Sequence, residues 1–176
     1  PSAWGHVLDH FVDGAEPRLD GADLDQLEAA YETFFAEAER GGFEQPVDDG
    51  WTAEQVVAHV ALNDLALTAV AHALVHRGEP TFENRTCQVV DTLDEVVAAW
   101  GDLAGLVANG RRCATQAVAA ARRLDPDQRA TLVPCRFEHD GEVVADHAMP
   151  WAQVAIEVQA ARHLPAHVEQ LQNLRR

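Results

Sequence analysis

Apolar residues recur at helical spacing along most of this chain. The segment Trp4–Phe11 has apolar side chains at i, i+3, i+4 and i+7, which predicts a short N-terminal helix. Gly14 and Pro17 follow it and are expected to end it. A longer apolar stripe from Leu24 to Ala38 predicts the first long helix, which the pair Gly41-Gly42 should terminate.

The second long helix has the clearest start signal in the chain. Thr52 is placed to cap its first turn, and Gln55 three residues later completes a capping box. Trp51 and Val56 occupy the two positions of a hydrophobic staple across that cap. The apolar pattern then continues to Arg77-Gly78, so the predicted helix is long and mostly apolar.

A third helix is predicted after a connecting loop over residues 79–90. Thr92 and Glu95 have capping-box spacing and are expected to begin it. Interior glycines cost about 1 kcal/mol each relative to alanine, so a kink or break is expected near Gly110. The helix should then resume and continue to Leu124, before an Asp-Pro pair.

The remaining segments predict a small extended insert and a last helix. Thr131–Phe137 and Glu142–Ala145 flank the turn pair Asp140-Gly141, a pattern typical of a β-hairpin. Pro150 suits the first turn of a final helix. Together the pattern predicts an all-α fold: a single domain over residues 1–176, built as a four-helix bundle with a short N-terminal helix and a hairpin insert before the last helix.

Charge and composition narrow the classes of partner. The formal net charge is -16, and the field of such a protein repels phosphate backbones and anionic membranes, so neither nucleic acid nor a membrane is an expected partner. No apolar run reaches the roughly 20 residues of a typical membrane-spanning helix, and no export signal is recognisable. The expected location is the cytoplasm. All 13 basic residues are arginine, which excludes Schiff-base chemistry and a P-loop lysine.

The three cysteines, Cys87, Cys113 and Cys135, do not indicate a disulfide framework or a cysteine-based zinc site. Their number is odd and no CxxC spacing occurs. Cys87 and Cys113 are expected to be buried free thiols, and Cys135 lies in the hairpin insert.

Histidines provide the candidate chemistry. His163 and His167 stand at i and i+4 in the predicted last helix, so their imidazoles lie about 40° apart around its axis and can reach one metal ion. His59 on another helix would complete a three-nitrogen site with open coordination positions, as in catalytic zinc sites. A lone histidine in an apolar helix is, however, more often a packed core residue.

Two features compete with this interpretation. His72 and His76 form a second i, i+4 pair, which capping of a helix C-terminus explains and which remains an alternative metal pair. Pro165 lies between His163 and His167 and removes a helical hydrogen bond. Either the helix bends there, or one helix ends near Leu164 and another begins.

Two short motifs resemble the DinB-like superfamily. The run from Trp51 to His59 is similar to that superfamily's second-helix motif, in which a tryptophan and a capped helix start precede a metal-binding histidine. His163-Leu-Pro-Ala-His167-Val-Glu-Gln-Leu resembles its last-helix motif, HxxxHxxQL. The resemblance implies an up-down-down-up four-helix bundle in which His59, His163 and His167 bind a divalent metal, zinc first, with nickel, manganese and iron as alternatives.

The resemblance also implies candidate activities. Relatives include S-transferases that use mycothiol, bacillithiol or glutathione, and a mycothiol-dependent maleylpyruvate isomerase, whose pattern has a glutamate where this chain has His163. It therefore suggests a metal-dependent, thiol-dependent S-transferase acting on a small electrophile. Arg162 is the candidate residue for binding a carboxylate of the thiol cofactor, and Asn63, Glu169 and Gln170 are candidate hydrogen-bond acceptors for the ligand histidines.

Three alternatives stay open. The chain could be a non-catalytic protein that binds a metal or small ligand in a stress response, a metal-dependent hydrolase, or a helical interaction module without a metal. Bundles of this kind often pair, so a homodimer is a weaker expectation.

Overall fold

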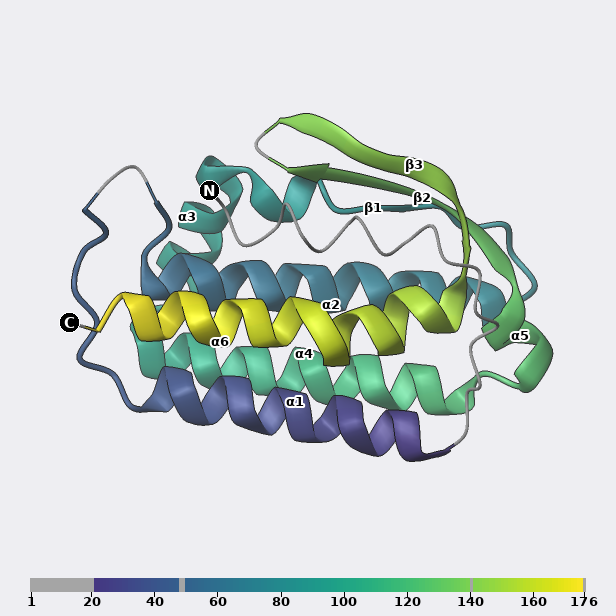
Figure 1. Ribbon diagram of the computed structural model, residues 1–176, viewed down its shortest axis with the longest axis horizontal. Helices are drawn as coiled ribbons and strands as arrows, with labels where there is room; N and C mark the ends of the chain where they lie inside the picture. The colour runs from purple at the N-terminus through teal and green to yellow at the C-terminus, as the bar shows by residue number, and fades with distance from the viewer. Residues whose placement is uncertain (1–20, 48–49, 140, 176) are drawn as a thin grey trace.

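Four long helices form a bundle, as the hydrophobic pattern predicts. The computed structural model describes residues 21–47, 50–139 and 141–175, so the helix predicted over Trp4–Phe11 lies outside the described residues. The long helices are α1 (Gly21–Glu39), α2 (Ala53–Val75), α4 (Leu103–Arg123) and the last helix, which joins a π-helical segment, η3 (Gln153–His163), to α6 (Leu164–Asn173). In Figure 1 the four lie side by side with their axes roughly parallel.

The apolar stripes of all four helices meet in one core. α1 contributes Leu27, Phe34 and Phe35, and the last helix contributes Ile156, Leu164 and Leu171, each at most 2% exposed. α2 begins with the predicted capping box: Gln55 N–H donates to the Thr52 hydroxyl, and the Gln55 side chain accepts from the Thr52 amide. The all-α four-helix fold is therefore confirmed.

α2 is also long and apolar enough to cross a membrane by length and composition alone, the one such helix among the described residues. Within the bundle, however, 61% of its apolar window is buried against the rest of the molecule. It also carries the buried polar side chains His59, Asn63 and Asp64. Its position in the core of the bundle therefore accounts for its apolar composition.

The third predicted helix is in fact two helices, and the break lies at Gly101 instead of Gly110. α3 (Val90–Trp100) begins after Val89 without a side-chain cap, so the capping box predicted at Thr92 and Glu95 is wrong. Gly101 has a φ of 89°, a conformation that favours glycine and ends α3. Asp102 then accepts a hydrogen bond from the Gly105 amide and caps α4, which ends at Arg123, one residue before the predicted Leu124.

Gly110 is a close-packing position within the unbroken α4. A Cβ atom built there would lie 2.9 Å from Cε1 of Phe35, a ring that is 1% exposed. We expect Gly110→Ala to lower the free energy of unfolding by about 1–3 kcal/mol despite alanine's higher helix propensity, because the buried ring must shift. Urea denaturation of the variant measures the effect. Gln116→Ala, at an exposed position of the same helix, is the control and should change the stability little.

A three-stranded sheet lies against one side of the bundle (Figure 1). The predicted hairpin is present as β2 (Leu132–His139) and β3 (Glu142–Pro150), paired antiparallel. The loop predicted over residues 79–90 instead contains β1 (Phe82–Glu83), which pairs parallel with β2, and a 3-10 turn, η2 (Thr86–Gln88). A short helix, α5 (Pro126–Ala130), precedes the hairpin.

The last helix changes its winding at the candidate histidines. Pro150 ends β3 and does not lie in the helix, which starts at Trp151. The wider π-helical winding of η3 continues to His163, where the Leu164 amide bonds to the carbonyl of Gln159, five residues earlier. α6 begins at Leu164, so Pro165 lies where the π-helical winding gives way to α-helical winding. His163 and Leu164 both keep right-handed helical backbone angles, so the last helix continues through this point and only its winding changes.

Candidate metal centre

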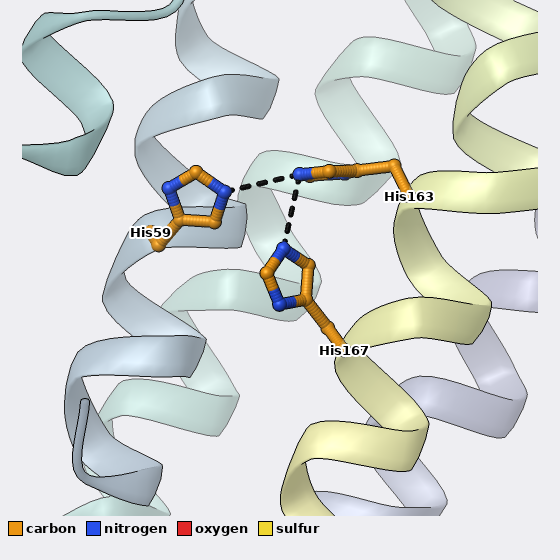
Figure 2. Close-up of side chains that lie close together, drawn as sticks. All are labelled: His59, His163 and His167. Carbon is orange, nitrogen blue, oxygen red and sulfur yellow. Dashed lines mark hydrogen bonds between the residues drawn. The ribbon is translucent and has the colours of Figure 1, made fainter. Parts of the chain in front are cut away.

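The structure brings His59, His163 and His167 together inside the bundle. His59 comes from the second turn of α2, and the other two come from the junction of η3 and α6 (Figure 2). Nε2 of His163 lies 3.0 Å from Nε2 of His59 and 3.2 Å from Nε2 of His167. Within the described part of the chain, these three form the only group of histidine, cysteine or acidic side chains arranged to hold a metal ion.

The outward hydrogen bonds of two of these rings orient them toward a common centre. Nδ1 of His59 donates to the carbonyl of Cys87 at 2.6 Å, and Nδ1 of His167 donates to Oε1 of Gln170 at 2.9 Å. Because a neutral imidazole carries one proton, both Nε2 atoms are left as lone-pair donors that face His163. Gln170 therefore has the acceptor role that the sequence suggested for it.

Burial keeps the three imidazoles neutral. His59 is 4% exposed, His163 6% and His167 1%. This loss of solvation lowers the pKa of His59 to about 4 and that of His167 to about 3. The pKa of His163 also lies well below its usual value, through burial and the proximity of the other two rings. A cation therefore does not have to displace protons at neutral pH.

The donor set fits a divalent metal ion. Zinc–nitrogen bonds of about 2.0–2.1 Å in tetrahedral geometry place ligand nitrogens roughly 3.3 Å apart, close to the two spacings observed here. The three ligand atoms all lie within 4.8 Å of one another, so a small movement of the rings would complete the site. Three neutral imidazoles are ligands typical of zinc, nickel and iron.

Trp51 forms one wall of the centre. Its ring centroid lies 4.8 Å from that of His59 and 6.5 Å from that of His167, and it stacks on His167 with an interplanar angle of 18°. The residue expected to staple the start of α2 therefore also packs on two of the three histidines. This contact limits the rotation of both rings and excludes water from their faces.

Other candidates from the sequence lie elsewhere or have other partners. Asn63 donates to Gln159 at 3.1 Å instead of serving His59, and Glu169 is exposed. His72 and His76 are exposed at the end of α2 and do not join a metal-ligand group within the described ranges. The three cysteines are buried free thiols, as expected for Cys87 and Cys113.

Arg162 directly precedes His163 and is half-buried. Among the residues that the structure describes, no ion pair of Arg162 is found, whereas Arg136 of the hairpin binds Glu138 and Asp146. Arg136 is therefore already neutralised by two carboxylates. Of these two arginines, Arg162 is the better placed to receive an external anion.

Sequence reasoning missed a buried acidic side chain in α2, that of Asp64. Its side chain is fully buried, and the Tyr31 hydroxyl donates to Oδ1 at 2.5 Å. Burial raises the pKa of Asp64 to about 8, only partly opposed by the hydrogen bond from Tyr31. The available signal was an acidic residue within the otherwise apolar run of α2.

Comparison with known proteins identifies the fold. No family model matches the sequence, and no curated protein matches it significantly. A solved structure described as the mycothiol-dependent maleylpyruvate isomerase superposes with a TM-score of 0.64 and 16% sequence identity, over 85% of this chain and 59% of that one. The chain therefore shares the fold of that structure over most of its described length.

A second structure agrees over most of both chains. YfiT from Bacillus subtilis, described as a probable metal-dependent hydrolase with an unusual four-helix bundle topology, superposes with a TM-score of 0.54 and 18% identity. The match covers 90% of this chain and 92% of YfiT, whereas this chain spans only 59% of the isomerase. The four-helix fold of YfiT therefore corresponds to most of the present chain.

Proposed function

We propose that this chain is a divalent-metal-dependent enzyme that transfers a low-molecular-weight thiol to a small electrophile. The observation that carries the proposal is the convergence of three neutral imidazoles, two of which have their outer nitrogens engaged by Cys87 and Gln170. His59, His163 and His167 would hold the metal, with zinc as the first candidate and nickel, manganese or iron(II) as alternatives. Once bound, such an ion would lower the pKa of a thiol or water molecule attached to it.

The protein's own residues would orient the reaction. Trp51 and the buried helix interior would restrict water around the histidines. Arg162 would bind a carboxylate of the thiol cofactor, because it is adjacent to His163 and has no ion pair among the described residues. The chemical step is substitution: the thiol loses its proton to solvent, a carbon–sulfur bond forms, and the bond to the leaving group breaks.

A metal-dependent hydrolase is the second candidate. The likeness to YfiT favours it, because that protein, described as a probable metal-dependent hydrolase, matches 90% of this chain. The isomerase favours a thiol reaction, because its description names mycothiol, although it is longer than this chain. In both proposals the binding partner is a small-molecule substrate. Both also include the cytoplasmic location and the homodimer expected from the sequence.

Turnover assays separate the two reactions. We expect zinc-loaded protein to form a thioether from 1-chloro-2,4-dinitrobenzene and mycothiol, bacillithiol or glutathione, measured by absorbance and mass spectrometry. The rate should fall to background after chelation and in His163→Ala. Hydrolysis of ester or amide substrates without any thiol would instead support the hydrolase. Tight metal binding without turnover in either assay would contradict both and indicate a binding protein.

A further inference from the structure

The orientation of His59 depends on a segment remote from it in sequence. Its Nδ1 donates to the main-chain carbonyl of Cys87, 28 residues further along the chain, at 2.6 Å. Cys87 lies in the 3-10 turn η2, between β1 and α3, and is 4% exposed. Because the acceptor is a backbone atom, the direction of the His59 ring depends on where this turn is held.

Two amide side chains hold the turn against β2. Asn84 makes a two-way contact with the main chain of Glu138: its Nδ2 donates to the Glu138 carbonyl at 3.2 Å, and its Oδ1 accepts from the Glu138 amide at 2.8 Å. Gln88 donates from Nε2 to the same carbonyl at 2.7 Å. These two side chains flank Cys87 in sequence, so the carbonyl that serves His59 lies between two attachments to the hairpin.

The attachment continues the sheet beyond its regular strands. β1 pairs with β2 as far as Glu83 opposite Arg136, and the Asn84 amide then bonds to the Arg136 carbonyl at 3.4 Å. On its other edge, the register of β2 against β3 shifts between Phe137 and Glu138, the residue whose main chain the Asn84 side chain contacts. The Arg85–Glu138 ion pair is long, at 3.7 Å, and the arginine is exposed, so it adds little.

We propose that Asn84 and Gln88 are positioning residues for the metal centre, acting through Cys87 and His59. They hold the Cys87 carbonyl so that it accepts the proton on Nδ1, which leaves Nε2 as the metal ligand. The β2–β3 hairpin, which lies outside the bundle, would thus help to orient His59 in the metal centre inside it. This inference rests on the proposed function, since it concerns the same three histidines.

Replacement of Asn84 and Gln88 tests the inference by metal affinity. We expect Asn84→Ala and Gln88→Leu each to weaken zinc binding by about tenfold, the lower end of the range for loss of an outer-shell partner, and the double variant to weaken it further. Competition with a chromophoric chelator measures the affinity. Asn109→Ala is the matched control, because Asn109 also donates from its side chain to a backbone carbonyl, that of Gly105, but within α4.

The tautomer of His59 provides a readout that a general loss of stability would not change. In the metal-free protein, ¹⁵N NMR should show the His59 ring protonated on Nδ1, and in the double variant a mixture of the two tautomers. Circular dichroism establishes that each variant is folded. Unchanged affinity together with an unchanged tautomer in the folded double variant would overturn the inference. If the wild-type protein binds no metal, the proposed function fails, while the tautomer measurement still decides whether Asn84 and Gln88 position His59.

Discussion

Replacing His163 with alanine is expected to abolish tight binding of a divalent metal ion. Nε2 of His163 is the central atom of the group, since it lies 3.0 Å from that of His59 and 3.2 Å from that of His167. Its loss leaves two imidazoles on separate helices. We expect affinity to fall by more than the roughly 100-fold that loss of an outer-shell partner can cost. Elemental mass spectrometry of tag-free protein should find about one ion per chain in the wild type and none in the variant.

A matched substitution separates this effect from a general one. His76→Ala removes an exposed histidine of the alternative pair at the end of α2 and should leave the metal content unchanged. His163→Ala also creates a small cavity, so circular dichroism must confirm that its helices remain. Retention of one ion per chain in folded His163→Ala, or its loss in His76→Ala, would contradict the assignment.

The wild-type protein is expected to become less stable between about pH 6.5 and about pH 8.5, and the substitution Asp64→Asn is expected to prevent most of this decrease. The pKa of Asp64 is raised by burial from 3.8 to about 8 in the folded protein, so the folded state holds a proton that the unfolded state releases. Between these two values, the free energy of unfolding therefore falls as pH rises. From about pH 6.5 to about pH 8.5 the wild type should lose about 2 kcal/mol from this group.

The measurement is urea denaturation of chelator-treated protein at both pH values. Above about pH 6.5 the three buried histidines, His59, His163 and His167, contribute little, because their pKa values in the folded protein lie below the ordinary value of 6.5 and their effect is confined to lower pH. Asp64→Asn keeps an oxygen that accepts from Tyr31 and should show a much smaller loss, which comes from the buried thiols Cys87 and Cys135, because burial raises their pKa values too. Asp91→Asn, at an exposed position, is the control and should behave as the wild type does. An equal pH dependence in Asp64→Asn would show that Asp64 is ionised in the folded state.

Local signals in the sequence predict those features that a few neighbouring residues can establish. The Thr52–Gln55 capping box, the β2–β3 hairpin and the long apolar stripes need only residues close together in the chain, and the structure confirms all three. The histidines of the last helix could likewise be paired from their spacing, since the backbone stays helical from His163 across Pro165 to His167.

Signals that compete locally were misjudged. Gly101 and Gly110 both weaken a helix by the same propensity, yet only Gly101 adopts a positive φ, while Gly110 accommodates the Phe35 ring within a continuous helix. Thr92 and Glu95 have capping-box spacing, but the helix already begins at Val90. Helix propensity alone could not show which glycine ends a helix or where α3 begins. Packing against α1 and the turn before α3 determine these two features.

The pattern of residues along the chain predicted the four-helix bundle, the cap of α2, the hairpin and the three histidines that the structure brings together. The assembled bundle was required to establish that His59 meets His163, that Cys87 supplies the acceptor for His59, and that Asp64 is buried beside Tyr31. The difference is one of range: caps and stripes depend on contacts within one or two turns, whereas these contacts join residues 104, 28 and 33 positions apart. Their energies depend on burial and on main-chain direction, which exist only once the bundle has assembled.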